Sequence, residues 1–551
     1  MIQKRLQILL VAGAGMFSLL SARIVHLQVF KGNDFARQAF HAHFRRIPVL
    51  PRRAAIWDRA GRLMAVSLET DSLCADPARV ADPVTAASLL SEILPISAGE
   101  LTSRLSRKNR RFVWLHRGIT PAIAERVQAA RIGGVFFKRE FQRFYPTSDM
   151  MASVLGFCGM DGRGLEGLES TLDRRLAGLP GEELQAFDAL SRPYSGDSVI
   201  LREPQQGEDV HVTLDAAVQY FVSVELKRIL QQENARWGAA VVMDVHTGDV
   251  LAMVTEPSFN PHLFSLTTPE SRRNRCATQL VEPGSTFKAV TLASAIDAGT
   301  VQLSETIDCE NGRFQVGSTV FSDWKAFSNL SVEDVIAYSS NIGTIKIAHR
   351  VGGTALADFS ARLGIGSLTV PGLPGAEAGY IRSPATWTDT ATASLSIGYG
   401  VALSPLQLAR VYAAFANGGY RVDPQIIRSS SRSPSIRIMD PATADQVSRA
   451  LTAAVARGTG KRAGPARYSA AGKTGTARRY DHASGRYDEN RVTCVFTGFA
   501  PAEHPRVSVC VIIDDPGHHK WASEVSASVF ARIVNRTLLY LGESPQRKAA
   551  A

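Results

Sequence analysis

Cysteine is scarce in this sequence, and the spacing of its few copies excludes the common zinc-binding motifs. The chain has 6 cysteines among 551 residues, and none forms a CxxC pair or stands at ligand spacing from histidines. Cys494 and Cys510 fall on two neighbouring predicted strands and could face each other, but we expect two buried free thiols. The cysteines therefore predict no metal site, and they leave the redox compartment open.

A concentrated basic region is also absent. The formal net charge is +11, but the arginines are spread along the chain, without the basic and aromatic face of a nucleic-acid-binding protein. We therefore expect no nucleic-acid partner and assign most arginines to a solvated surface. An even basic excess also suits a protein that lies close to an anionic membrane.

Internal repeats and low-complexity linkers are missing as well. Apolar residues make up 45% of the chain and charged residues 21%, which is ordinary for a globular protein and unlike a disordered one. The length is sufficient for roughly two or three domains with a large core.

One stretch near the N-terminus is long and uncharged. Lys4 and Arg5 precede 17 residues without charge, 6–22, at the short end of the range for a membrane-spanning helix. A cleaved signal peptide is the alternative, but cleavage after Ala22 would place Leu20 at the position that requires a small residue. We expect an uncleaved anchor that starts in the cytoplasm, so that the rest of the chain is exported.

The remainder divides into two regions of different character. Residues 31–207 mix short strands, turns and polar helices, with a strand, a turn and a strand predicted over 52–77. From 208 onward, a strand ends at Asp215, a candidate helix N-cap. The elements expected after it are a helix over 216–235, a hairpin over 238–258, strands over 491–500 and 506–515, and a closing amphipathic helix over 521–542 that includes Trp521. Strands and a helix that enclose a largely helical insert indicate one α/β domain with an antiparallel sheet.

The stretch VEPGSTFKAV contains the first candidate chemical motif. Ser285 and Lys288 open an otherwise apolar helix, and residues three apart share a helical face. A buried lysine loses much of its preference for the charged form and can accept a proton from a serine hydroxyl. Backbone amides at the helix start can stabilise an oxyanion. A capping serine beside a snorkelling lysine is the structural alternative.

The second motif separates two helical runs, 331–338 and 342–351. Ser331 and Asp334 resemble a capping box that opens the first run. Ser339 or Asn341 could simply cap the second run. In the functional interpretation, Ser339 relays a proton and Asn341 holds a peptide bond of a substrate.

The third motif, AAGKTGTAR, is expected on a strand at the edge of the sheet. Gly475 lacks a side chain, so the backbone of a ligand could come close. Lys473, Thr474 and Thr476 offer a cation and hydroxyls for a carboxylate. A phosphate-binding loop is excluded, because such a loop needs a glycine where Arg467 stands.

Ser-x-x-Lys, Ser-x-Asn and Lys-Thr-Gly, in this order and with gaps of 54 and 134 residues between the first positions, resemble the signature of penicillin-binding proteins and serine β-lactamases. RRAAIWDRAGRLMAVS, RFYP and GLEGLE are similar to the pedestal of class B penicillin-binding proteins, and residues 393–419 to their transpeptidase domain. SSNIGTIKIA is more similar to the division-specific FtsI type than to the elongation type. Ala54 departs from the pedestal pattern, which usually has glycine there, and this concerns a turn rather than the chemistry.

The resemblance implies an architecture in three parts. An anchor over 1–30 is followed by a mixed pedestal of the dimerisation type over 31–207 and a transpeptidase domain over 208–545. The transpeptidase domain is expected to have the α/β (α+β) fold of penicillin-binding proteins and serine β-lactamases, with an antiparallel sheet and a helical subdomain.

The resemblance also implies a role for each motif residue in a serine-type D-Ala-D-Ala transpeptidase. Ser285 would be the nucleophile, Lys288 the base and Ser339 the proton relay to the leaving D-alanine. The backbone amides of Ser285 and Thr476 would form the oxyanion hole. Substrate would be held by Asn341, Lys473, Thr474, Gly475 and Thr476. No metal or organic cofactor is expected.

The implied partners are peptidoglycan stem peptides, β-lactams that acylate Ser285, and an FtsW-like glycosyltransferase with other division proteins. The small residues Gly13 and Gly15 could form a packing face on the anchor helix. Alternatives are an elongation-specific transpeptidase, a serine β-lactamase or carboxypeptidase, and a non-catalytic division scaffold. The stretch 479–490 borders the third motif and is either part of an acceptor site or simply solvated.

Overall fold

The computed structural model describes residues 2–187, 193–370, 372–383, 387–429, 434–481 and 486–546. The chain divides into two compact units by its internal contacts. The first unit combines Met1–Ala54 with Ala177–Glu208, and the second combines Ala55–Leu176 with Asp209–Ala551.

The first unit contains the apolar helix and a small sheet. Helix α1 (Ile2–Val25) belongs to a helical stretch of 29 residues, Ile2–Phe30, with a mean hydropathy of 2.0 and a length sufficient to cross a membrane. A helix is therefore present where the anchor was predicted. Helix α2 (Gly32–His43) leads into an antiparallel sheet of order β1-β6-β7, whose strands are β1 (Phe44–Val49), β6 (Gly181–Phe187) and β7 (Pro193–Arg202).

The second unit begins with the predicted strand, turn and strand. Between β2 (Ile56–Trp57) and β3 (Leu63–Ala75), the buried Asp58 carboxylate accepts hydrogen bonds from the N–H groups of Ala60 and Arg62, both at 2.8 Å. Ala54 is outside the set of residues with positive φ, so the backbone there does not require the glycine of the pedestal pattern.

Helices cover one face of the sheet that β3 forms with its neighbours. Strands β4 (Val113–Ile119) and β5 (Val135–Phe144) both pair with β3 in antiparallel fashion. The helices that contribute to the core on this sheet are α3 (Pro83–Ser91), α4 (Ala98–Leu105) and α5 (Pro121–Ala129). The alternation of apolar side chains along the strands places Leu73 and Leu115 in this core, and the partly buried Phe137 packs against it.

A buried ion pair joins two of the pedestal sequence patterns. Arg143 of the RFYP stretch donates from Nε to Glu169 Oε1 at 2.7 Å, and both side chains are almost completely buried. Glu169 lies on α7 (Gly167–Thr171), and its second carboxylate oxygen accepts a hydrogen bond from the Cys158 thiol at 3.2 Å. The two patterns are therefore parts of one polar cluster.

A five-stranded antiparallel sheet forms the centre of the second unit. Its strand order is β10-β9-β21-β20-β19. The predicted hairpin is present as β9 (Trp237–Asp244) and β10 (Val250–Glu256), and the C-terminal strands are β20 (Arg486–Ala500) and β21 (Val507–Asp514). Strand β19 (Ala471–Asp481) is at the edge of this sheet, as predicted for the third motif.

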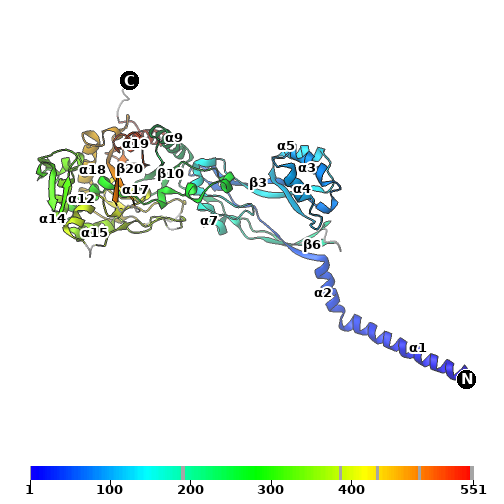
Figure 1. The fold of residues 1–551 in the computed structure, drawn as a ribbon. Helices are drawn as coiled ribbons and strands as arrows, with labels where there is room; N and C mark the ends of the chain where they lie inside the picture. Colours follow the sequence, from blue (N-terminus) through cyan, green and yellow to red (C-terminus); the bar gives the residue numbers. More distant parts are fainter. Residues whose placement is uncertain are drawn as a thin grey trace. The chain divides into compact units, whose positions relative to one another are not determined.

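Helices pack on both faces of this sheet. Helices α9 (Ala216–Glu233) and α19 (Ser526–Tyr540) share one core with it, and α17 (Pro405–Ala416) packs against β9, β20 and β21 (Figure 1). The side chain of Asp215 caps α9 by accepting from Ala217 N at 3.0 Å, as predicted. The helices nearest the site are α12 (Lys288–Asp297), α13 (Val332–Ala337), α14 (Asn341–Val351), α15 (Gly353–Arg362), α16 (Asp389–Ser396) and α18 (Pro441–Ala456).

The closing helix begins later than predicted. It starts at Ser526, and Trp521 lies in a turn in which its carbonyl accepts from Glu524 N at 3.0 Å. Thr476 Oγ1 accepts from Ala522 N at 3.1 Å and ties this turn to β19. The apolar spacing suggested that Trp521 is a core residue. This prediction was wrong, because its side chain is 63% exposed.

Two small two-stranded sheets inside the helical region were not predicted. The pairs are β11 (Thr306–Asp308) with β14 (Asn329–Ser331), and β12 (Arg313–Val316) with β13 (Thr319–Ser322). These strands of three or four residues are too short for an alternating pattern to identify.

Candidate active site

The first motif lies on a short 3₁₀ turn that continues into α12. The turn is formed by Gly284–Phe287, and Lys288 is the first residue of the helix. Phe287, Val290 and Leu292 are buried, which confirms that this is a central helix. Ser285 is half-buried, and the three-residue spacing places Lys288 on the same face one turn later.

Lys288 connects the first motif to the second. Its side chain is fully buried, and Nζ donates to Ser339 O at 2.7 Å, to Asn341 Oδ1 at 2.7 Å and to Ser339 Oγ at 3.3 Å. Burial lowers the pKa of Lys288 to about 7, while the carboxylate of Asp323 acts in the opposite direction. Near neutral pH, a large fraction of this amine can therefore act as a base.

The second motif forms a sharp turn between α13 and α14. Ser331 caps α13 by accepting from Asp334 N at 3.0 Å, as predicted. The cap of α14 is Ser340, which accepts from Gly343 N at 2.9 Å. Both capping assignments considered from the sequence were therefore wrong, because the residue between Ser339 and Asn341 has this role. Ser339 itself has a φ of +62°, an uncommon conformation for a residue other than glycine.

The third motif places a second buried lysine close to the first. Lys473 is fully buried, and its Nζ donates to Thr474 O at 3.2 Å and to Thr459 Oγ1 at 3.3 Å. Burial lowers the pKa of Lys473 well below its usual range, and the charge of Lys288 acts in the same direction. Lys473 is therefore not a free surface cation. It is an amine that gains a proton most readily when an anion arrives.

Gly475 stands at a close contact between β19 and the turn that carries Ser285. A Cβ atom at this position would lie 2.4 Å from Pro283 O and 3.0 Å from Thr286 Cγ2. Glycine at this position allows β19 to lie directly against the turn that carries Ser285.

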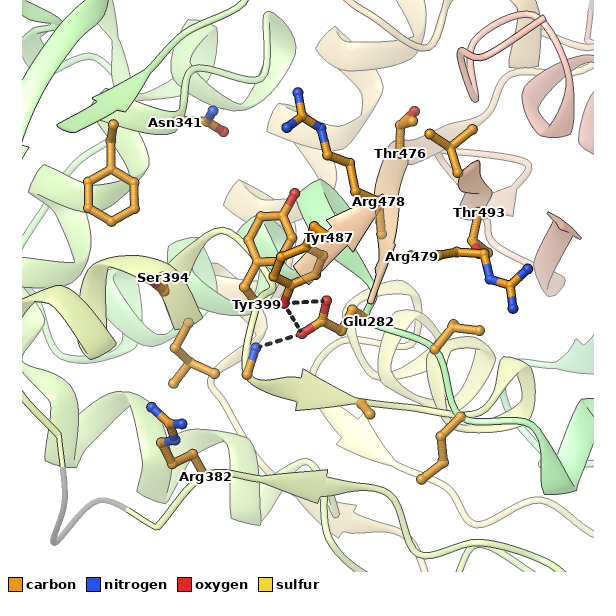
Figure 2. Close-up of a pocket in the computed structure, with 18 of the residues that line it drawn as sticks. Glu282, Asn341, Arg382, Ser394, Tyr399, Thr476, Arg478, Arg479, Tyr487 and Thr493 are labelled. Carbon is orange, nitrogen blue, oxygen red and sulfur yellow. Dashed lines mark hydrogen bonds between the residues drawn. The ribbon is translucent and has the colours of Figure 1, made fainter. Parts of the chain in front are cut away.

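A cleft of about 1610 Å³ borders the motifs, and Asn341 and Thr476 are among its lining residues. Figure 2 shows these two side chains near Arg478, which follows on the same strand as Thr476. The exposed Trp324 and Trp521 also line the cleft. Of the stretch 479–490, Arg479 and Tyr487 line this cleft, and residues 482–485 lie outside the described part of the chain.

Glu282 is a lining residue that sequence reasoning missed. Its carboxylate accepts from Tyr487 Oη at 3.1 Å to each oxygen and from Gly400 N at 3.1 Å (Figure 2). Tyr399 packs edge-on against Tyr487, with ring centroids 5.7 Å apart. Burial raises the pKa of Glu282. Its position three residues before Ser285 was the available signal, but the contacting residues are more than 100 positions away.

Metal ligation has no candidate in the described part of the chain, where no group of three or more His, Cys, Asp and Glu side chains is placed to hold an ion. All six cysteines are buried and free. Cys494 and Cys510 therefore form no disulfide.

Together, the edge strand, the central serine helix and the three convergent motifs define a penicillin-binding transpeptidase fold with a pedestal. Residues 48–212 match the penicillin-binding protein dimerisation domain, and residues 238–535 match the penicillin-binding protein transpeptidase domain. The chain belongs to the class B penicillin-binding proteins and is a peptidoglycan D,D-transpeptidase. Membership implies peptidoglycan as substrate and β-lactams as ligands.

Named relatives cover almost the whole chain. The probable peptidoglycan D,D-transpeptidase PenA of Neisseria gonorrhoeae is 34% identical over 99% of this chain and 94% of its own length. The peptidoglycan D,D-transpeptidase FtsI of Escherichia coli K12 is 31% identical over 96% of this chain and 90% of its own length.

Solved structures show the same fold. Penicillin-binding protein 3 from Mycobacterium tuberculosis, in complex with aztreonam, has a TM-score of 0.72 at 25% identity and covers 92% of this chain and 99% of its own. Penicillin-binding protein 2X from Streptococcus thermophilus has a TM-score of 0.75 at 23% identity, with coverage of 91% and 81%.

Proposed function

We propose that this protein cross-links peptidoglycan stem peptides during septal cell-wall synthesis through an acyl-serine intermediate on Ser285. The observation that carries the proposal is the buried amine of Lys288, one helical turn from Ser285 and hydrogen-bonded to both Ser339 and Asn341. An amine with a pKa of about 7 suits a general base near neutral pH.

In the acylation step, Ser285 Oγ attacks the carbonyl carbon of the D-Ala-D-Ala bond, and Lys288 accepts the hydroxyl proton. The backbone N–H groups of Ser285 and Thr476 stabilise the oxyanion. Ser339 passes a proton to the nitrogen of the departing D-alanine. The amine of a neighbouring stem then attacks the acyl carbon and forms the cross-link, and its proton passes by way of Lys288 to Ser285 Oγ as the acyl–oxygen bond breaks.

Substrate recognition falls to the second and third motifs. Asn341 holds the amide of the donor peptide, and its side chain is already oriented, because Nδ2 donates to Ser322 O at 2.8 Å. Thr474 and Thr476 hold the terminal carboxylate by their hydroxyls. The buried Lys473 supplies positive charge to the carboxylate, because an arriving carboxylate favours the protonated form of this amine.

Intact-protein mass spectrometry after penicillin treatment, with the modified peptide mapped, tests this site. The expected result is one penicilloyl adduct on Ser285. An adduct elsewhere, or none, would contradict the proposal. A fluorescent penicillin that stays bound for many minutes would favour a transpeptidase, whereas rapid turnover would favour the β-lactamase or carboxypeptidase alternative. Rescue of growth by Ser285→Ala would instead favour a non-catalytic scaffold.

The septal role is supported by the 31% identity to FtsI of Escherichia coli and by the SSNIGTIKIA stretch. Depletion of the protein is expected to give filaments, and round cells would favour the elongation-specific alternative. We place the transpeptidase domain over 208–545, the pedestal over 31–207 and a single membrane pass within 1–30. The catalytic domain then lies outside the cytoplasmic membrane. An FtsW-like glycosyltransferase is the membrane partner that the resemblance implies, and the small residues Gly13 and Gly15 would let a partner helix approach the anchor closely.

A further inference from the structure

Asp323 is an acidic residue of the cleft wall that lies outside the three motifs. It directly follows β13, and its backbone N–H donates to Gly312 O at 3.1 Å. Its side chain is half-buried and lines the cleft. The small hairpin β12–β13 therefore carries a carboxylate to the second motif from a position 18 residues earlier in the chain than Asn341.

Both carboxylate oxygens of Asp323 are bonded to this motif. Oδ2 accepts from Ser340 Oγ at 2.7 Å, and Oδ1 accepts from the backbone N–H groups of Asn341 and of Ile342, the latter at 3.2 Å. These N–H groups belong to the first turn of α14, where the helix offers them no partner of its own. The positive end of the helix dipole also favours a carboxylate at this position.

The residue before Asp323, Ser322, holds the same motif through its backbone carbonyl. Ser322 O accepts from Asn341 Nδ2 at 2.8 Å, so the main chain and the amide of Asn341 are both fixed by residues 322–323. The remaining amide oxygen of Asn341 then faces Lys288 Nζ at 2.7 Å. Ser339, whose φ is +62°, supplies the two other acceptors of Lys288. Its uncommon backbone conformation persists because neighbouring contacts hold the turn.

We propose that Asp323 is a positioning residue of the transpeptidase reaction: it holds Ser339 and Asn341 around Lys288 and supplies a negative charge close to this amine. The proposal rests on the function proposed above, in which Lys288 is the base. In that mechanism, Asp323 touches neither the substrate nor Ser285, and it acts through Ser340 and Asn341.

Two charged groups act on the Lys288 amine from different elements. Lys473 on β19 and Lys288 repel each other when both are protonated, and Asp323 after β13 stabilises the ammonium form. Loss of the Asp323 charge therefore lowers the pKa of Lys288 further. The acid limb of the pH–rate profile, where the acylation rate falls because Lys288 becomes protonated, then moves to lower pH. At pH values above this limb, the amine is a weaker base than in the native protein.

The test compares Asp323→Asn with the native full-length protein in detergent, by the second-order rate constant for acylation by a fluorescent penicillin between about pH 5 and pH 9. Asparagine retains one acceptor oxygen but no charge. We expect the rate above the limb to fall roughly tenfold to a hundredfold, as for a lost hydrogen bond to a charged group, and the acid limb to shift to lower pH. Asp389→Asn is the matched control, because Asp389 lies in the first turn of α16, and within the described part of the chain it shares no hydrogen bond or ion pair with the motifs.

Asp323→Glu separates position from charge. Glutamate keeps the negative charge but displaces the carboxylate, so we expect a lower rate with the acid limb near its native position. This variant also keeps the proposal testable if Asp323→Asn does not fold, as judged by circular dichroism. If Asp323→Asn has the acylation rate and the pH dependence of the native protein, the proposal is overturned. It is also overturned if the rate falls but the pH dependence does not move, because Asp323 would then have only a structural role. Failure of the native protein itself to be acylated would instead overturn the proposed function.

Discussion

At the scale of single residues, the complete burial of two lysines, Lys288 and Lys473, in one site is unusual. Burial disfavours the charged form of both, and their mutual repulsion adds to this effect for Lys473. Neither contributes apolar packing that a methionine could not supply. Their retention in the core is explained by proton transfer and anion binding rather than by stability.

The first prediction concerns the pH dependence of acylation. The pKa of Lys288 is lowered to about 7, so the neutral base is lost as the pH falls through this value. We expect the acylation rate constant to drop about tenfold for each pH unit below the pKa of Lys288. The measurement uses a fluorescent penicillin in well-buffered solutions. Lys288→Arg, whose guanidinium stays protonated, should lose about a thousandfold or more. A rate that does not change between about pH 6 and pH 8 would contradict the assignment of Lys288 as base.

The second prediction concerns Gly475→Ala. The added methyl group would lie 2.4 Å from Pro283 O, so either β19 or the Ser285 turn must move. Overpacking of this kind costs about 1–3 kcal/mol, and we expect acylation to fall at least about tenfold, because positional errors near 1 Å reduce rates strongly. Gly99→Ala is the control: nothing lies within 4 Å of an added Cβ at this exposed position of α4. Native acylation in Gly475→Ala would show that the close approach is dispensable.

At the scale of elements, long patterns could be predicted and short ones could not. The hairpin of β9 and β10, helix α9 with its Asp215 cap and the edge position of the third motif all followed from periodicity and turn residues. The start of α19 was wrong, because the bond from Ala522 N to Thr476 Oγ1 depends on a residue 46 positions away. Asp323 and Glu282 were missed for the same reason, since their partners are distant in sequence.

The third prediction concerns the junction of β5 and α7. Removal of one partner from a buried ion pair such as that of Arg143 and Glu169 costs about 3–5 kcal/mol. We therefore expect Glu169→Ala to lower the melting temperature of the protein clearly. Glu69→Ala on the adjacent strand is the control, because its pair with Arg139 is exposed and contributes about 1 kcal/mol at most. Equal melting temperatures for the two variants would contradict a buried ion pair at this junction.

At the scale of the whole molecule, the sheets of the two units differ greatly in how many of their residues are buried. Every residue of β9, β10 and β21 is buried, whereas β1 has no buried residue and β6 has two, Gly181 and Ala186. Local stability follows the density of buried apolar contacts around each hydrogen bond. The proposed acylation site therefore lies beside the five-stranded sheet, whose strands β9, β10 and β21 are more buried than β1 and β6.

The fourth prediction follows from this difference and concerns hydrogen exchange in the full-length protein. Amides of β1 and β6 are expected to exchange at least about a thousandfold faster than those of β9 and β21, because opening a small, exposed sheet requires little apolar surface to be wetted. Hydrogen-exchange mass spectrometry with and without bound penicillin measures both classes. Acylation should slow exchange near β19 and the Ser285 turn and leave β1 and β6 unchanged, since a ligand stabilises the unit that binds it. Exchange in β6 as slow as in β21 would show that the first unit has a source of stability beyond its own described contacts.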